Sequence, residues 1–136
     1  QRVLVRGGGC VLIEPYHGVL ARPFYRNLHD GEHFNMSQDS WRTQGESGAM
    51  TNANQALSYM VFVRDRARFD REYPGLEIVE VKTISNYLQY LLSGGLNFRQ
   101  LVPNALIGTV KLTERLLRPM ESLSALHHVI VLRKRS

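Results

Sequence analysis

Apolar residues gather along the chain in a few short runs that polar and glycine-rich segments separate. The first run, Cys10 to Ile13, is apolar at every position, which is typical of a strand covered on both faces of a sheet. Gly7 to Gly9 precede it and can adopt the left-handed backbone that ends a helix. Pro15 is expected to end the pairing because it has no N–H. The chain therefore begins with the predicted end of a helix, a glycine turn and a buried strand.

Two further strands are expected. The segment from Leu76 to Ile84 mixes apolar residues with three charges, so it suits a strand near the edge of a sheet. The segment from Leu126 to Arg133 is apolar on both of its faces, which places it inside a sheet. Its two faces are formed by His128, Ile130 and Leu132 on one side and by Val129 and Val131 on the other.

Helical periodicity and capping residues predict five helices between these strands. They are Gly18 to Leu28, Thr51 to Phe62, Arg66 to Tyr73, Asn86 to Leu92 and Pro103 to about Leu117. The second has an alternative, because Tyr59 to Val63 also suits a short strand. For the third we expect Asp65 as the N-cap and Pro74-Gly75 as the stop, and Gly94-Gly95 is expected to stop the fourth.

The last of these helices combines an apolar face with a basic stripe. Lys111, Arg115 and Arg118 form the stripe, and Glu114 has the spacing to pair with Arg118. The apolar face comprises Val102, Ala105, Leu106, Val110, Leu112, Leu116 and Leu117. Leucines beside basic residues also allow peripheral contact with a membrane surface.

The polar stretch 29–52 is long for a loop inside a compact domain, so it is predicted to be a lid or loop. Trp41 lies within it and is expected to pack onto the core or a ligand. The sequence His29-Asp30-Gly31-Glu32-His33 holds metal-binding residue types, but its central glycine disfavours a helix that would bring the histidines together. We therefore expect a solvated or substrate-facing segment there and no metal site.

The candidate site follows the first strand, because open α/β sheets bind ligands just past the carboxyl ends of their strands. Glu14, Tyr16 and, from the loop, Trp41 are the candidate substrate-binding residues. His17 is the candidate catalytic residue, since a histidine can remove a proton near neutral pH. The alternative is that Tyr16 packs on the loop and His17 is merely exposed. His127 and His128 point to opposite faces of a strand, so we expect structural roles for them.

Composition narrows the classes of protein. A chain of 136 residues with 43% hydrophobic and 21% charged residues suits one globular domain. No long apolar run predicts a membrane span. The single cysteine, Cys10, excludes an internal disulfide and fits a reducing, cytoplasmic compartment. The net charge of +5 is spread along the chain apart from Arg133 to Arg135, which favours a solvated basic tail over a specific nucleic-acid site.

The order of elements resembles the C-terminal half of class I S-adenosylmethionine-dependent methyltransferases. Arg6-Gly7-Gly8-Gly9 and the strand ending in Glu14-Pro15 are similar to the family's fifth strand and the turn before it, although the usual proline of that turn is absent. Phe69 to Ile78 resembles the passage into the sixth strand, and Ala125 to Leu132 resembles the seventh. The likeness spans almost the whole chain, with 86–119 as a helical insertion.

The resemblance implies an α/β fold: a partial Rossmann-like sheet of three strands, with the final strand antiparallel between the other two. It also implies transfer of a methyl group from S-adenosylmethionine to a small or lipid-like acceptor. The family's glycine-rich cofactor loop has no counterpart, because Gly7 to Gly9 precede a strand. Since Gln1 is not a methionine and no cofactor-binding residue is found, we expect the C-terminal portion of a longer protein, with no activity alone.

Two alternatives remain open from the sequence. One is a non-enzymatic binding module of α/β class whose sheet edge pairs with a partner chain. The other is a nucleic-acid-associated domain, which the positive charge would favour and a steep salt dependence of binding would reveal.

Overall fold

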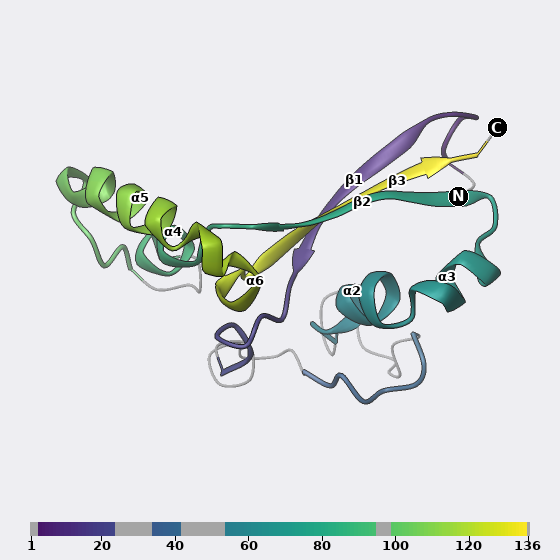
Figure 1. The fold of residues 1–136 in the computed structure, drawn as a ribbon, viewed down its shortest axis with the longest axis horizontal. Coiled ribbons are helices and arrows are strands. Elements are labelled where there is room, and N and C mark those ends of the chain that lie inside the picture. Colours follow the sequence, from purple (N-terminus) through teal and green to yellow (C-terminus); the bar gives the residue numbers. More distant parts are fainter. Residues whose placement is uncertain (1–2, 24–33, 42–53, 95–98, 136) are drawn as a thin grey trace.

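The computed structural model describes residues 3–23, 34–41, 54–94 and 99–135. Its centre is a three-stranded antiparallel sheet in the order β1-β3-β2, formed by Gly9–Pro15, His127–Lys134 and Leu76–Ile84 respectively (Figure 1). Because β3 is antiparallel to both neighbours, β1 and β2 run parallel to each other. The mixed α/β class and the central, antiparallel final strand are therefore confirmed.

A glycine turn leads into β1, as predicted. Gly7 has φ +71°, a left-handed conformation that glycine adopts without strain. A Cβ added to Gly9 would lie 2.5 Å from the carbonyl oxygen of Leu132, so a side chain there would force the two strands apart. β1 ends at Pro15, as predicted, with Pro15 opposite His127 as its last pair. Just beyond the strand, the N–H of Tyr16 donates to the Leu126 carbonyl at 2.7 Å.

β1 is not covered on both faces, which corrects the sequence prediction. Cys10 and Leu12 pack against the core, whereas Val11 and Ile13 on the other face are 62% and 64% exposed. The purely apolar pattern therefore does not mark burial within the part of the chain that the structure describes. It leaves two large aliphatic side chains in water on a strand at the edge of this sheet.

β2 has the predicted bounds and lies at the other edge of the sheet, as its charges indicated. Its pairing with β3 shifts register between Ile78 and Glu80, so that Val79 is an extra residue in the strand. Such a bulge increases the local twist and is common at sheet edges. The guanidinium of Arg66 donates to the Ile78 carbonyl at 3.1 Å, beside the bulge.

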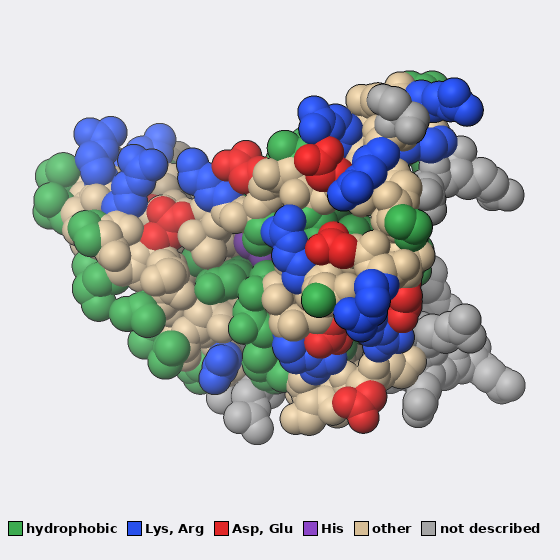
Figure 2. Space-filling model, turned by 45° about the vertical axis from the view of Figure 1, so that its right-hand side comes forward, with side chains coloured by type: hydrophobic (Ala, Val, Ile, Leu, Met, Phe, Trp, Pro, Cys, Tyr) green, Lys and Arg blue, Asp and Glu red, His purple; other side chains and the backbone are tan. Residues whose placement is uncertain are grey.

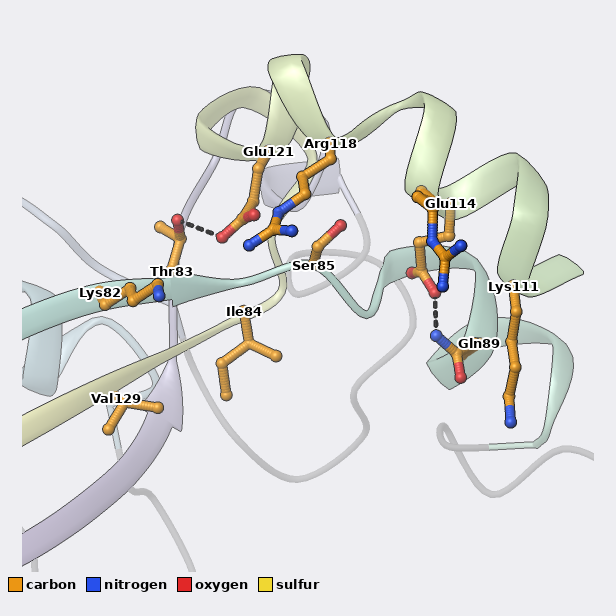
Figure 3. Close-up of a pocket in the computed structure, with 11 residues that line it drawn as sticks. Lys82, Thr83, Ile84, Ser85, Gln89, Lys111, Glu114, Arg118, Glu121 and Val129 are labelled. Atoms are coloured by element: carbon orange, nitrogen blue, oxygen red, sulfur yellow. Dashed lines mark hydrogen bonds between the residues drawn. The ribbon is translucent and has the colours of Figure 1, made fainter.

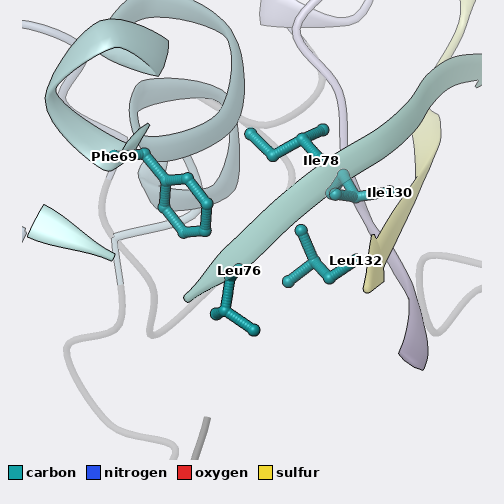
Figure 4. Packing of buried hydrophobic residues seen from close by; sticks show 5 residues of the cluster. All are labelled: Phe69, Leu76, Ile78, Ile130 and Leu132. Atoms are coloured by element: carbon teal, nitrogen blue, oxygen red, sulfur yellow. The ribbon is translucent and has the colours of Figure 1, made fainter. Parts of the chain in front are cut away.

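The core lies on one face of the sheet. Ile130 and Leu132 of β3 pack with Leu76 and Ile78 of β2 and with Phe69 (Figure 4). Three helical segments run along this face: α2 (Leu57–Tyr59), the π-helical turn η1 (Met60–Arg64) and α3 (Arg66–Glu72). On the opposite face Val129 and Val131 are only half-buried.

These helices settle two expectations. The alternative strand at 59–63 is wrong, because those residues are helical, and the helix begins at Leu57. Thr51 and Asn52, the expected caps, lie outside the described residues. Asp65 precedes α3 as predicted but its carboxylate does not cap the helix. It accepts hydrogen bonds from Arg64 and from the Trp41 indole instead.

The predicted insertion 86–119 forms a projecting arm at the end of the sheet where β2 ends and β3 begins (Figure 1). We call residues 85–94 and 99–124 the helical arm. Its elements are α4 (Tyr87–Leu92), η2 (Asn104–Leu106), α5 (Ile107–Leu116), η3 (Arg118–Met120) and α6 (Glu121–Ser124). None of its described helices is long and apolar enough to cross a membrane, nor is any other that the structure describes.

Packing in the arm differs from the expected pattern. Glu114 is the buried residue of α5, and its carboxylate accepts hydrogen bonds from the Leu88 backbone N–H at 3.1 Å and from Gln89 Nε2. The predicted pairing of Glu114 with Arg118 is therefore wrong, because the carboxylate faces the first turn of α4. A negative charge is favourable at that end of a helix.

Two predicted segments fall largely outside the described residues. Of the helix expected from Gly18 to Leu28, the structure describes a turn and helical backbone at Arg22 and Pro23. Of the polar stretch 29–52 it describes 34–41, so the expected lid and the His29 to His33 segment are mostly not described.

The two faces of β3 give a stability test. Replacing Ile130 by alanine removes a fully buried side chain and should lower the free energy of unfolding by about 2–5 kcal/mol. The matched change Val131→Ala, on the half-covered face, should cost about 1 kcal/mol. Urea unfolding of both variants measures the difference, and equal losses would contradict the one-sided core.

Candidate functional site

A cavity of about 530 Å³ opens at the carboxyl end of β1, against α2 and η1. Its wall is mostly apolar, with a few polar groups. The lining residues are Glu14, Pro15, Asn54, Gln55, Leu57, Ser58, Val61 and Phe62. Apolar walls with a few placed polar groups are typical of sites for small molecules. We call this space the β1 cavity.

Ser58 and His128 connect the cavity to the sheet. The Ser58 hydroxyl lies 2.6 Å from His128 Nε2 and donates to the Pro15 carbonyl at 3.2 Å. Because the hydroxyl proton goes to Pro15, the oxygen is left to accept from the N–H at Nε2. His128 is fully buried, its Nδ1 has no hydrogen-bond partner among the described residues, and burial lowers its pKa to about 4. The imidazole is thus neutral and donates to the Ser58 oxygen, which orients the hydroxyl. It does not accept the hydroxyl proton, so it does not activate Ser58 as a nucleophile.

His17, the candidate base, lies behind the wall of the cavity. It is 3% exposed, and its Nε2 N–H donates to the Gln55 carbonyl at 3.0 Å. Burial lowers its pKa to about 4, more than the Gln55 contact raises it. The expectation of a merely exposed His17 is wrong. A neutral His17 that already donates from Nε2 could act as a base only through Nδ1, so its catalytic role stays a prediction.

Tyr16 and Glu14 do lie together at the end of β1. The Tyr16 ring contacts the rings of His128 and Tyr59, with centroids 5.6 and 6.1 Å apart. Burial raises the pKa of Tyr16 above its ordinary value, and the nearby Tyr59 raises it further. Burial also raises the pKa of Glu14, which makes its carboxylate a better proton acceptor than an exposed one.

Trp41 packs in a different place. Its indole N–H donates to Asp65 at 2.9 Å, its ring stacks on Tyr73, and the Arg68 guanidinium lies 4.2 Å above the ring centroid. The structure thus places Trp41 on α3 and against the core cluster, not beside Tyr16 and Glu14 in its described contacts. A substrate contact from Trp41 stays a prediction.

The histidines of β3 separate as expected. His127 points to the other face, where Asn86 donates to its Nδ1 at 3.1 Å and Tyr90 packs on the ring. Among the described residues no group of histidine, cysteine, aspartate and glutamate side chains could hold a metal ion.

A second cleft, of about 610 Å³, lies between the sheet and the helical arm (Figure 3). Its rim carries one basic side chain from β2 and three from α5 and η3: Lys82, Lys111, Arg115 and Arg118. Glu114 and Glu121 also line it, and Thr83 donates to the Glu121 carboxylate at 2.7 Å. We call this space the arm cleft.

Sequence reasoning missed Gln55 and Ser58 as site residues. Both lie just before or within a short helix, and no motif singles them out. Ser58 meets Pro15 and His128, and Gln55 meets His17, only because α2 and the residues before it pack against the end of β1, so the signal is a tertiary one. Comparison with protein-family models, curated proteins and solved structures finds no match.

The buried histidines predict how stability depends on pH. Their pKa values are about 4 in the folded chain and about 6.5 when unfolded, so the unfolded chain binds more protons between these values. The free energy of unfolding should fall as pH drops from 6.5 to 4, by about 1 kcal/mol per pH unit for each histidine.

Urea unfolding across this window measures the slope, and His17→Gln and His128→Gln should each reduce it. Glu14, with a raised pKa, opposes the trend as a single group. The Arg64 hydrogen bond lowers the pKa of Asp65 to about 2. Protonation of Asp65 therefore lowers the free energy of unfolding only below about pH 3.8. A stability that stays constant through the window would refute the assignment of neutral, buried imidazoles.

Proposed function

We propose that this chain forms the acceptor-binding part of an S-adenosylmethionine-dependent methyltransferase that methylates a small or lipid-like molecule. The observation that carries the proposal is the strand order β1-β3-β2, with the C-terminal strand antiparallel between two strands that are parallel to each other. A sheet in which the last strand inserts between two earlier ones is what the resemblance to class I methyltransferases implies.

The position of the β1 cavity supports the same function. In open α/β sheets ligands bind outside the carboxyl ends of parallel strands, and the cavity opens at that end of β1. Leu57, Val61 and Phe62 supply an apolar wall for an acceptor, and Glu14 supplies a carboxylate that can take up the acceptor's proton. Ser58, held by His128, offers a hydroxyl oxygen with a fixed direction.

The chain's own residues therefore bind and orient the acceptor and exclude water from one side of it. Holding an acceptor in the reactive orientation can supply much of the rate of methyl transfer. His17 holds the backbone at Gln55 and so shapes the cavity wall, whether or not it also acts as a base.

The residues described do not fit a site for the methyl donor. Gly7 to Gly9 lead into a strand, and Gly94 follows the end of α4, so neither forms a glycine-rich turn that opens a helix. S-adenosylmethionine is therefore assigned to none of these residues, and the proposed activity belongs to the natural gene product.

The carboxylate of Glu14 tests the proposal. The natural full-length gene product, given tritiated S-adenosylmethionine and an extract of small molecules and lipids from its source cells, should transfer label to a component of the extract. Glu14→Gln should lower kcat/KM for that component by about tenfold or more, because the amide cannot accept a proton.

The matched control is Glu77→Gln, at the far end of the sheet, where the carboxylate makes an exposed ion pair with Arg133. This variant should keep full activity. Absence of any methyl transfer, or equal effects of Glu14→Gln and Glu77→Gln, would argue against the β1 cavity as an acceptor site.

One observation favours the alternative of a binding module. β1 is an edge strand in the described sheet and carries exposed Val11 and Ile13, so a partner's strand could pair with it. A stable, monodisperse dimer of the 136-residue chain, together with no methyl transfer by the natural gene product, would favour that function.

A further inference from the structure

We propose that the helical arm docks on the surface of an anionic lipid bilayer, with the arm cleft receiving lipid phosphates. Three observations support this: basic residues around one cleft that have no ion pair within the described part of the chain, carboxylates that are already hydrogen-bonded, and large aliphatic side chains exposed beside them. The proposal does not depend on the proposed methyltransferase activity.

The four basic residues of the arm cleft are all exposed. Elsewhere in the described residues, Arg64, Arg68 and Arg133 each make an ion pair. Lys82, Lys111, Arg115 and Arg118 make no ion pair with any residue that the structure describes. Lys82 comes from β2 and the others from α5 and η3, so the fold gathers them around one space.

The two carboxylates of the cleft reduce this positive charge only in part. Glu114 is 4% exposed and accepts from α4, and Glu121 accepts from Thr83. Both therefore have hydrogen-bond donors of their own. Four cations and two carboxylates leave a net charge of +2 around the cleft. Phosphate groups would find unpaired guanidinium and ammonium groups at its rim.

Large aliphatic side chains lie on α5, which carries Lys111 and Arg115, and on the adjoining η2. Leu112 is 56% exposed and Leu116 is 72% exposed, and Leu106 is 52% exposed. Basic and hydrophobic side chains adjoin each other at the end of the arm in Figure 2. A helix that leaves its leucines in water while it buries a glutamate is inverted relative to an ordinary surface helix.

This combination fits a bilayer surface better than a nucleic acid. Phosphates alone would explain the cations, but they would leave the leucines exposed. In an interfacial helix the leucines enter the acyl boundary, while lysine and arginine extend along it toward the lipid phosphates. Aromatic side chains, which would stack on bases, are absent from α5 and η3.

Vesicle binding by the natural full-length gene product tests the proposal. It should sediment with vesicles of equal parts phosphatidylglycerol and phosphatidylcholine, and less so as salt is raised, but not with phosphatidylcholine alone. The pair Lys111→Gln and Arg115→Gln should weaken binding about tenfold or more. The pair Leu112→Gln and Leu116→Gln should do the same, because buried apolar area is lost. Glutamine favours helices, so α5 should stay folded, which circular dichroism checks.

The matched control is the pair Arg71→Gln and Arg135→Gln, which removes two exposed cations outside the arm and should bind vesicles as the wild type does. Three outcomes would overturn the proposal: no binding to anionic vesicles, equal losses in the control pair and the Lys111/Arg115 pair, or full binding by the leucine pair. Binding to a DNA or RNA duplex that depends on Lys111 and Arg115 but not on the leucines would assign the arm to nucleic acid instead.

Discussion

Hydrogen bonding of β3 to both of its neighbours holds the fold together. β1 and β2 are far apart in the sequence, and this last strand lies between them and pairs with seven residues of β1 and eight of β2. Ile130 and Leu132 then form the centre of the core, and His128 reaches Ser58 from the same face. β3 thus contributes to both candidate sites: His128 holds Ser58 of the β1 cavity, and Val129, which points to the opposite face, lines the arm cleft.

The β1 cavity and the arm cleft differ in the burial and the pairing of their polar groups. Near the β1 cavity the fold buries the neutral imidazoles of His17 and His128. Each donates its Nε2 N–H to one oxygen atom, and burial keeps both pKa values low. At the arm cleft the cations stay in water and without ion pairs among the described residues. The first arrangement suits a small, partly apolar ligand, and the second suits phosphate groups that arrive from solvent.

Local patterns in the sequence were enough to find the three strands that the structure describes, the bounds of β2 and the helices α3, α4 and α5. They also identified β3 as the interior strand, because a segment that is apolar on both faces is best buried between two neighbouring strands. They failed where the outcome depends on distant partners. Nothing in the sequence near Glu114 indicates that its carboxylate would accept hydrogen bonds from α4. Nothing near Asp65 indicates that its carboxylate would accept a hydrogen bond from Trp41 instead of capping α3.

The same limit applies to the candidate site. The strand-end position of Glu14 and Tyr16 followed from a general rule for open sheets, and both lie there. The burial of His17 and the contribution of Ser58 did not follow, since both require α2 to pack against the end of β1. The exposure of Val11 and Ile13 is the reverse case: the local pattern predicts cover that the described residues do not provide.

If this chain is the acceptor-binding part of a class I methyltransferase, as proposed, β1 lies inside a larger parallel sheet in the natural gene product. The N–H of Tyr16 donates toward β3, and the N–H of Lys134 donates to Gly8, so by the alternation of an antiparallel ladder the N–H groups of Val11 and Ile13 point to the free edge. Amide hydrogen exchange of these two residues in the natural full-length gene product, compared with the 136-residue chain, tests the claim. Strong protection of Val11 and Ile13 in the gene product, but not in the 136-residue chain, is the predicted result. Rapid exchange in both, with the Leu12 amide protected as an internal reference, would contradict it.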